Sequence, residues 1–491
     1  MDSCLVIPLA GYGKKFVRVG YKTLKPFLKI DQNNNMLDLI IRNFPKNIKK
    51  IFIVRRNIQP KYLKILKKYK NSEILFIKSH NLGSLYSLYL VKKELSKLKN
   101  IFLSYCDIHW SRKNTEIKKL ENNFVYCFKN WHPFTVDNNN YAFCKSINKK
   151  IIAIREKNSF TKKWQEEPLS IGLFFFKLGA EMVNSFEKII EKKIKINNEY
   201  YPSLAFNFIK NKKVKYVNYF CHIGKPDYFE IFKKWYKFYT NKESFKNKIK
   251  KVNLADKIII PAAGRGQRFL NENIKTPKFL CKVGINKKKM ISLIKDYLPN
   301  NKKIQLITLR RNTNFLRKNF EIHSLNKITK GQADTVMHVL DKTLQNKSIF
   351  INSCDAFSLF NINLYRALKN KSDILIFVSQ NIETDSATNE GTWIKSKNNK
   401  VQRVYVKTPK IKNSLRLTGN FYFKNKNIFI QCFKKVIKNR TKKEILIDNL
   451  VEEGVKMNLK VYCISDDIYL NMGTPKLLKE FNFWENYFNV Y

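Results

Sequence analysis

The amino-acid sequence predicts an α/β fold built from two tandem, homologous domains with mainly parallel sheets. Three observations lead to this prediction. The chain has 491 residues, which is too long for one hydrophobic core and suits two domains. Short β-branched runs alternate with amphipathic segments, as expected where helices cover both faces of a parallel sheet. In addition, the same short landmarks occur twice along the chain in the same order.

The repeat begins with LVIPLAGYGKKF in the first half and IIIPAAGRGQRF in the second. Gly11 aligns with Gly264, and Lys25 aligns with Lys278 at the same offset of 253 positions. The later pairs lie 248 or 249 positions apart; they are Gly83 with Gly331, Asp107 with Asp355, and Gly224 with Gly473. Chance does not produce five ordered landmarks with so little drift. We therefore predict one domain over residues 1–240 and a second over 255–491, joined by a linker over 241–254 that is rich in Lys and Asn.

Hydrophobic patterning places the individual elements. In the first domain we expect four strands and three helices; the strands are Cys4–Pro8, Ile51–Val54, Ile74–Ile77 and Ile101–Ser104, and the helices are Met36–Asn43, Pro60–Tyr69 and Leu82–Leu95. In the second domain we expect strands Lys257–Pro261, Ile304–Thr308 and Ile349–Ser353, and helices Ile291–Tyr297 and Asp334–Leu344.

The composition excludes several classes of protein. The formal charge is +57, but only 15 of the 95 basic residues are Arg and the Lys residues are spread over the whole chain, which argues against dedicated nucleic-acid binding. Such a diffuse positive field would still attract nucleoside triphosphates. The nine Cys residues show no CxxC spacing, so we expect buried free thiols in a cytoplasmic protein. We expect neither a signal peptide nor a membrane span.

The strongest site signal is the glycine-rich segment after the first strand of each domain. Two glycines directly after a strand allow a tight turn whose amides can face phosphate oxygens. In the second domain Arg268 and Lys278 flank this segment, and two cations suit the charge of a triphosphate. A purely structural turn is the alternative interpretation for a glycine pair.

AAGxGxRF followed by PK resembles the fingerprint of the nucleotidyltransferase superfamily with a glycosyltransferase-A-like fold, which includes sugar-phosphate nucleotidylyltransferases and phosphocholine-type cytidylyltransferases. The first domain, with IPLAGYG, LKPFL and YCDIHW, looks most like the branch found in capsule and surface-polysaccharide gene clusters. The resemblance implies catalytic roles for Arg268, Lys278, Lys15 and Lys25. It implies nucleotide binding by Ala10, Gly11, Gly13, Gly83, Ala263, Gly264, Gly266, Gly331 and Gln332.

A carboxylate follows the fourth predicted strand of the first domain and its counterpart in the second. Asp107 and Asp355 should lie at the carboxyl edge of the sheet, where a hard ion such as Mg²⁺ takes one or two carboxylates plus substrate phosphates. Capping of the following turn is the alternative role. Family members with sugar-1-phosphate substrates usually carry a second Asp near the late glycine, but His222 and Asn471 stand here.

Later segments should bind the phosphorylated acceptor. Glu156 and Lys157 resemble an acidic-basic pair near the sugar phosphate, and Lys407 keeps only the cation in the second domain. Glu199 and Glu444 are matching acids, for which helix capping is the alternative.

The sequence thus predicts nucleotidyl transfer from a nucleoside triphosphate to a phosphorylated metabolite, a sugar phosphate or a phospho-alcohol, with release of pyrophosphate. We expect the second domain to be the more competent one, because Lys15 replaces the usual Arg in the first and loses its planar fork. Two other interpretations stay open. One is a metal-dependent glycosyltransferase, although neither Asp lies in a DxD motif. The other is a tandem nucleotide-binding protein without turnover.

Overall fold

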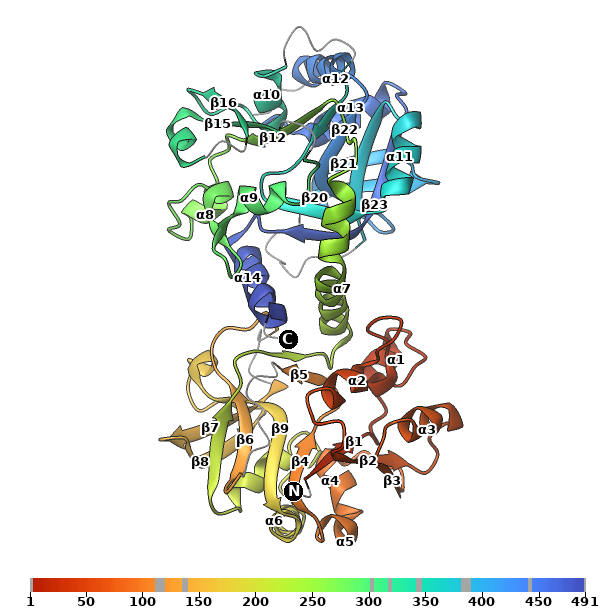
Figure 1. Cartoon of the computed structure of the whole chain (residues 1–491), viewed down its shortest axis with the longest axis vertical. Helices are drawn as coiled ribbons and strands as arrows, with labels where there is room; N and C mark the ends of the chain where they lie inside the picture. The colour runs from red at the N-terminus through yellow and green to blue at the C-terminus, as the bar shows by residue number, and fades with distance from the viewer. Residues whose placement is uncertain are drawn as a thin grey trace. The chain divides into compact units, whose positions relative to one another are not determined.

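The computed structural model describes residues 3–110, 120–134, 140–300, 304–316, 320–340, 347–380, 390–439 and 444–489. The chain divides into two compact units: unit 1 comprises Met1–Tyr236 with Tyr487–Tyr491, and unit 2 comprises Lys237–Asn486. Helix α7 (Pro226–Ile249) runs into the segment predicted as a linker, which is therefore helical as far as Ile249 (Figure 1). No helix in the described ranges is long and apolar enough to span a membrane.

Unit 1 is organised around one large sheet. Its strands are β1 (Cys4–Pro8), β2 (Lys49–Arg55), β3 (Ser72–Ile77), β4 (Lys99–Ser104), β6 (Asn123–Phe128), β7 (Ala142–Ile147), β8 (Lys150–Glu156), β9 (Leu169–Leu178) and β10 (Lys212–Tyr216). Their order in space is β3-β2-β1-β4-β9-β6-β10-β8-β7. A separate short pair, β5 (Ile108–Trp110) with β11 (Phe220–His222), is antiparallel.

Unit 2 has the same strand order. Its strands are β12 (Lys257–Ala262), β15 (Ile304–Leu309), β16 (Glu321–Leu325), β17 (Ile349–Ile351), β18 (Ala356–Phe360), β19 (Ile374–Ser379), β20 (Glu390–Lys397), β21 (Lys400–Pro409), β22 (Leu415–Phe423) and β23 (Val461–Asn471). The order is β16-β15-β12-β17-β22-β19-β23-β21-β20, with β18 paired to β23. Each place in the first sheet therefore has an equivalent strand in the second sheet, and the equivalent strands occur in the same order along the chain.

The expectation of mainly parallel sheets is wrong, because both sheets are mixed. Strands β3, β2, β1 and β4 are parallel, but β9 lies antiparallel between β4 and β6, as β22 does in unit 2. At the far edge β7 and β8 form a hairpin. Its two turn residues, Asn148 and Lys149, have φ of 48° and 64°. Asn398 and Asn399, in the β20–β21 hairpin, have φ of 50° and 64°. Two-residue turns of this kind join antiparallel strands.

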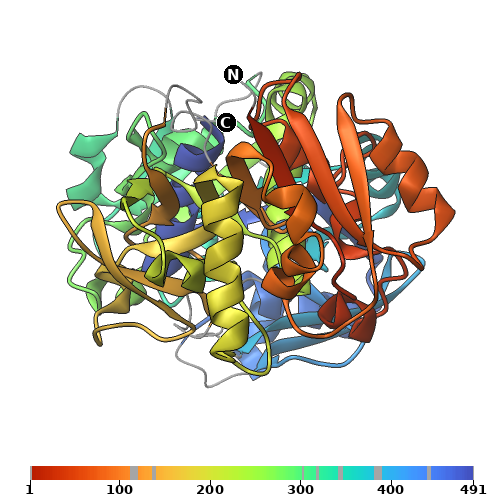
Figure 2. The same cartoon turned by 90° about the horizontal axis from the view of Figure 1, so that it is seen from below.

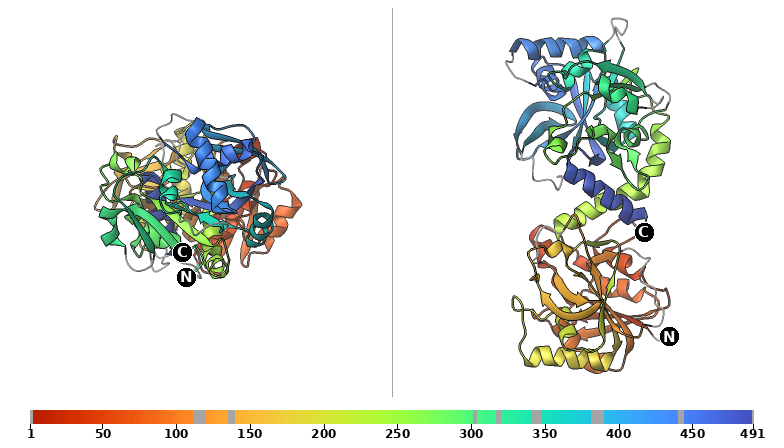
Figure 3. Two further views of the ribbon diagram at one scale, coloured as in Figure 1. Left: turned by 90° about the horizontal axis from the view of Figure 1, so that it is seen from above. Right: turned by 90° about the vertical axis from the view of Figure 1, so that its left-hand side faces the viewer.

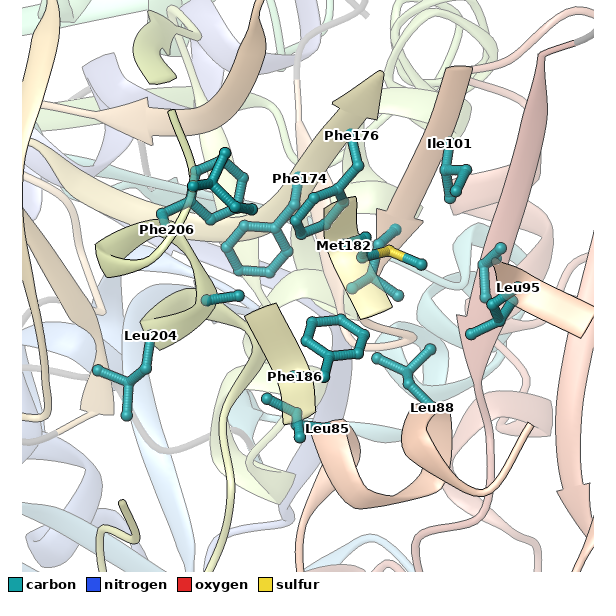
Figure 4. Close-up of a cluster of buried hydrophobic side chains, with 14 of the residues drawn as sticks. Leu85, Leu88, Leu95, Ile101, Phe174, Phe176, Met182, Phe186, Leu204 and Phe206 are labelled. Carbon is teal, nitrogen blue, oxygen red and sulfur yellow. The ribbon is translucent and has the colours of Figure 1, made fainter. Parts of the chain in front are cut away.

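Helices cover both faces of the unit 1 sheet, because the strands carry apolar side chains on both faces. On one face Ile101 packs with α4 (Ser84–Tyr89), α5 (Lys92–Leu95) and α6 (Gly179–Glu191) in a buried cluster (Figure 4). Helix α6, the yellow helix of Figure 2, contacts β4 and β9. On the other face Phe102 contacts Phe44, which follows α2 (Met36–Ile41), and Phe52 contacts Tyr69, which follows α3 (Pro60–Lys67).

Unit 2 is covered in the same manner. Helices α12 (Lys426–Asn439) and α13 (Ile447–Lys456), in blue, pack on β22 and β21 (Figure 3). The remaining helices of this unit are α8 (Gln267–Leu270), α9 (Met290–Lys295), α10 (Gln332–Met337), α11 (Ile362–Lys371) and α14 (Pro475–Asn489).

The strand predictions are confirmed within a few residues, and two helix predictions need correction. The segment Leu82–Leu95 forms α4 and α5 in place of one helix, because Val91 has φ of −116° and ψ of 29° and leaves the helical region. The predicted helix Asp334–Leu344 is α10, which ends at Met337, and residues 341–346 lie outside the described ranges. All nine Cys residues are buried and free, as expected.

Candidate active site

The site in each unit lies at the edge where two neighbouring parallel strands end. In unit 1, β1 pairs with β4 in parallel, so the glycine loop after β1 and Asp107 after β4 come to the same edge. In unit 2, β12 and β17 bring the second glycine loop and Asp355 together in the same way. Ligands of α/β sheets bind beyond the carboxyl ends of the strands. This edge is therefore the candidate site.

The second glycine of each loop adopts a left-handed conformation. Gly13 has φ of 63° and precedes helix α1 (Lys14–Arg18), and Gly266 has φ of 69° and precedes α8. Side chains with a Cβ are strained in this region, which explains why glycine occupies both places. The first glycines, Gly11 and Gly264, have open space where a Cβ would lie, so an anion can approach their backbone closely.

A partly buried ion pair marks the centre of the unit 1 site. The Lys25 ammonium lies 2.9 Å from Oδ2 of Asp107. Burial opposes ionisation of Asp107, but Lys25 and His222 outweigh this effect and hold the pKa of Asp107 well below its usual range. Burial likewise disfavours the charged Lys25, and Asp107 more than compensates, so that the pKa of Lys25 is raised. Both groups are charged in the folded protein.

Unit 2 repeats this pair at the matching positions. The Lys278 ammonium lies 2.5 Å from Oδ2 of Asp355, and Ser353 donates a hydrogen bond to the other carboxylate oxygen. Burial opposes the ionisation of Asp355, yet Lys278 and Ser353 lower its pKa, with a further contribution from the charge of Arg268. The structure thus brings Arg268, Lys278 and Asp355 into one site.

Further lysines surround the unit 1 pair. Partial desolvation and the charges of Lys225 and Lys25 lower the pKa of Lys15, and Lys157 adds to this effect. Several cations close enough to disfavour one another's charge need an anionic ligand to compensate them. The unit 1 site is therefore suited to a ligand with several negative charges, such as a polyphosphate.

Residues distant in sequence complete the surroundings of each carboxylate. Antiparallel pairing of β5 with β11 places His222 opposite Ile108, and its Nε2 lies 3.5 Å from Oδ2 of Asp107. Pairing of β18 with β23 places Asn471 opposite Ala356, next to Asp355. His222 and Asn471 therefore occupy corresponding places in the two units.

A glycine lies tightly against each carboxylate, where a Cβ would have no room. A Cβ on Gly224 would lie 2.3 Å from Oδ2 of Asp107 and 2.4 Å from Nε2 of His222. A Cβ on Gly473 would lie 2.5 Å from Oδ2 of Asp355 and 2.9 Å from Oδ1 of Asn471. A carboxylate beside an imidazole or an amide oxygen can contribute ligands to a divalent cation. In the described ranges no three His, Cys, Asp or Glu side chains gather as a complete metal cage, so an ion here would also need water or substrate oxygens.

The predicted acceptor residues of unit 1 lie together. Lys157 donates a hydrogen bond of 2.6 Å to the Tyr201 hydroxyl, which donates one of 2.5 Å to Glu199. Glu156 is buried and accepts a hydrogen bond from Ser203. Burial raises the pKa of Glu156 to about 7, despite the opposing effect of that hydrogen bond.

Unit 2 holds a related cluster that sequence reasoning only half found. Lys407 and Glu444 form an ion pair of 2.6 Å, and Lys407, like Lys157, has a positive φ. The sequence predicts that unit 2 has no carboxylate in the place of Glu156, but the structure brings Asp448, at the start of α13, close to Lys407. Asp448 accepts a hydrogen bond from Thr392, and burial raises its pKa in spite of that bond and of Lys407. Each unit thus has a carboxylate whose pKa is raised by desolvation beside the predicted acceptor residues.

Gly83 and Gly331, which the sequence assigns to nucleotide binding, lie close to the chain segments that contain Glu199 and Glu444. A Cβ on Gly83 would lie 2.6 Å from the carbonyl oxygen of Tyr200 and 2.9 Å from Cβ of Glu199. A Cβ on Gly331 would lie 2.4 Å from the carbonyl oxygen of Ile445, beside Glu444. The remaining assigned residues are Ala10 and Ala263, which are buried in the glycine loops, and Gln332, which begins α10.

Each unit is thus a mixed α/β domain with a glycine-rich loop and a Lys–Asp pair at one sheet edge. No protein-family model and no curated protein matches the chain. Among solved structures it is similar to a nucleoside-diphosphate-sugar pyrophosphorylase from Vibrio cholerae, with 21% identity and a TM-score of 0.38 over 46% of this chain and 98% of the other.

Two further similar structures are an inositol-1-phosphate CTP transferase from T. maritima and a CTP:phosphocholine cytidylyltransferase from Streptococcus pneumoniae. The first has 14% identity and a TM-score of 0.33, and covers 46% of this chain and 96% of its own. The second has 15% identity and a TM-score of 0.37, and covers 48% of this chain and 99% of its own.

Proposed function

We propose that the protein transfers a nucleotidyl group from a nucleoside triphosphate to a phosphorylated small molecule, a sugar phosphate or a phospho-alcohol. An oxygen of the acceptor phosphate attacks the α-phosphorus, the bond between the α-phosphorus and the bridging oxygen breaks, and pyrophosphate leaves. The observation that carries the proposal is the partly buried Lys–Asp pair beside a glycine loop at a sheet edge, which recurs in both units.

The cations have the charge that this reaction needs. Negative charge builds up on the transferring and leaving phosphoryl oxygens, and fixed cations in a partly desolvated site stabilise it. Lys278 and Arg268 supply them in unit 2, and Lys25 and Lys15 supply them in unit 1. When a triphosphate enters, the Lys ammonium can turn from the Asp to the phosphate.

We propose that Asp355 would hold Mg²⁺ in unit 2, and that the ion would neutralise part of the charge of the triphosphate. The amide oxygen of Asn471, which accepts a hydrogen bond of 2.7 Å from the Gly473 backbone amide, lies on the side of Asp355 and supports this role. The ion would polarise the α-phosphate, while Lys278 and Arg268 orient the triphosphate. On the acceptor side, Lys407 and Glu444 would position the incoming phosphate in unit 2, as Lys157, Glu156 and Glu199 would in unit 1.

We further propose that the units are homologous copies, domains over residues 1–240 and 255–491, and that the product enters surface-polysaccharide assembly. The identical strand order and the five paired sequence landmarks support the duplication. Limited proteolysis with mass analysis tests the division: first cuts between the units agree with it, whereas first cuts inside either large sheet contradict it.

The test of the reaction is pyrophosphate release by the full chain with each of four nucleoside triphosphates against a panel of sugar phosphates and phospho-alcohols. We expect one combination to be turned over. Lys278→Ala should then lower the rate by about 10²–10³-fold if unit 2 is the main catalyst, which is the usual cost of removing one charge-stabilising group. Lys25→Ala tests unit 1, and the exposed Lys282→Ala is the matched control.

Other outcomes would favour the alternatives. Consumption of a nucleotide sugar without pyrophosphate would indicate a glycosyltransferase. Nucleotide binding without turnover in any combination would indicate a nucleotide-binding protein that does not catalyse the reaction.

A further inference from the structure

The two units present different side chains to the same space. In unit 1 the space beside Asp107 is bounded by the imidazole of His222, and in unit 2 the space beside Asp355 is bounded by the amide of Asn471. Strand pairing puts both side chains in place, since β11 pairs with β5 as β23 pairs with β18. The difference is therefore a change of donor atom at one equivalent position of the two units.

The distance in unit 1 is that of two ligands of one ion. Nε2 of His222 and Oδ2 of Asp107 are 3.5 Å apart. Two donors bonded to one ion at about 2.1 Å lie roughly 3.0 Å apart at a right angle and about 3.4 Å apart in a tetrahedral arrangement. Only glycine fits at position 224, because a Cβ there would lie within 2.4 Å of both atoms.

The imidazole can bind an ion through Nε2 with its ring proton on Nδ1. Nδ1 is buried and has no hydrogen-bond partner among the described residues. An unpaired N–H at this place carries a desolvation cost, which the bond from Nε2 to the ion has to exceed. Nε2 would then be a nitrogen donor beside the Asp107 carboxylate.

We propose that the units select different ions: unit 1 takes a divalent transition ion of the Mn²⁺, Co²⁺ or Zn²⁺ class through Asp107 and His222, and unit 2 takes Mg²⁺ through Asp355 and Asn471. Imidazole nitrogen suits transition ions, whereas carboxylate and amide oxygens suit Mg²⁺. The inference rests on the proposed function in one respect, because substrate phosphates would supply further ligands. Lys25 would leave Asp107 for those phosphates.

The experiment uses the full chain with Mn²⁺ and inorganic tripolyphosphate, a probe that contains no nitrogen. Pulsed electron paramagnetic resonance then detects nitrogen bonded to Mn²⁺ only if the protein supplies it. We expect an imidazole signal in the wild type, its loss in His222→Asn, and its persistence in His338→Asn, a partly exposed control. Asn471→His should add a second population with bound nitrogen, which keeps the test informative if His222→Asn fails to fold.

A titration gives a second readout. We expect excess Mg²⁺ to displace Mn²⁺ from the site without nitrogen and to leave the nitrogen-bound Mn²⁺ largely in place. His222→Asn should weaken binding of that Mn²⁺ by at least tenfold and make both sites equally sensitive to Mg²⁺.

The outcomes separate this inference from the proposed function. A nitrogen signal that depends on His222, in a protein that releases no pyrophosphate with any substrate pair, would support the ion assignment and contradict the proposed reaction. Pyrophosphate release by a protein whose nitrogen signal is absent, or unchanged in His222→Asn, would overturn the ion assignment and leave the reaction standing.

Discussion

Glu156→Gln should stabilise unit 1 at alkaline pH and have little effect at pH 5. Glu156 is 9% exposed, and burial raises its pKa from the usual value of 4.5 to about 7. Between these pH values the folded unit keeps a proton that the unfolded chain has released. The free energy of unfolding therefore falls as the pH rises from about 5 to about 7, and it stays at the lower value above that range.

The size of the effect follows from the difference between the two pKa values. Because one pKa unit corresponds to about 1.4 kcal/mol, charging Glu156 costs unit 1 on the order of 3 kcal/mol at pH 8. Gln has the same shape, can accept the hydrogen bond from Ser203 and carries no charge, so it removes this cost.

Hydrogen exchange with mass analysis of peptides from β8 and β9 measures the effect locally, and comparison at equal pH cancels the intrinsic exchange rates. At pH 8 we expect these amides to exchange up to about 100-fold more slowly in Glu156→Gln than in the wild type, and at pH 5 we expect near equality. Glu94→Gln, on the exposed surface of α5, is the control. Equal exchange of wild type and Glu156→Gln at pH 8 would refute the reasoning.

Three more substitutions test the unit 2 site. Gly473→Ala puts a methyl group against Asp355 and should reduce Mg²⁺-dependent turnover by about tenfold or more without unfolding the protein, as measured by a Mg²⁺ titration of the rate. Asp448→Ala should raise the KM for the acceptor much more than the KM for the nucleotide, because Asp448 lies near Lys407 and Glu444, the proposed acceptor residues. Gly331→Ala should destabilise unit 2 by about 2–3 kcal/mol, since its φ is 137° and a Cβ would meet the carbonyl oxygen of Ile445; thermal unfolding measures this loss.

Each of these has a result that would contradict it. Unchanged Mg²⁺ dependence in Gly473→Ala would show that the space is not an ion site. Equal changes in both KM values for Asp448→Ala would remove this residue from the acceptor side. A Gly331→Ala protein that melts at the wild-type temperature would show that the loop can move away from Ile445.

Much of the fold could be predicted because its signals are local. The β-branched runs that become β1 and β12 are each followed by a glycine loop, and this shared pattern indicates that the two strands are equivalent. Strand direction was not predictable from the same patterns, because the run SIGLFFF of β9 reads alike whether the strand is parallel or antiparallel. The paired Asn-rich turns after β7 and β20 were the available sign of antiparallel hairpins.

The site residues also fall into those that the sequence could predict and those that it could not. Asp107 and Asp355 could be placed because each closes a strand next to the glycine loop, and their Lys partners lie in a fixed motif. Asp448 could not be predicted from the sequence. Aligning Glu199 with Glu444 pairs Asp448 with Ser203, whereas the carboxylate that Asp448 resembles in the structure is Glu156 on β8. Burial of the Asp448 carboxylate depends on packing between α13 and β21, which sequence periodicity does not report.

The central claim is that this chain forms a bond between a nucleotide α-phosphate and a phosphorylated acceptor. The most direct measurement is incubation of the full chain with α-³²P-labelled nucleoside triphosphates and the acceptor panel, followed by separation of products. We predict a labelled nucleotidyl product formed in equal amount to pyrophosphate, and its loss when Lys25 and Lys278 are both replaced by Ala. Product formation that is unaffected by this double substitution, or labelled nucleotide that never joins any acceptor, would contradict the account.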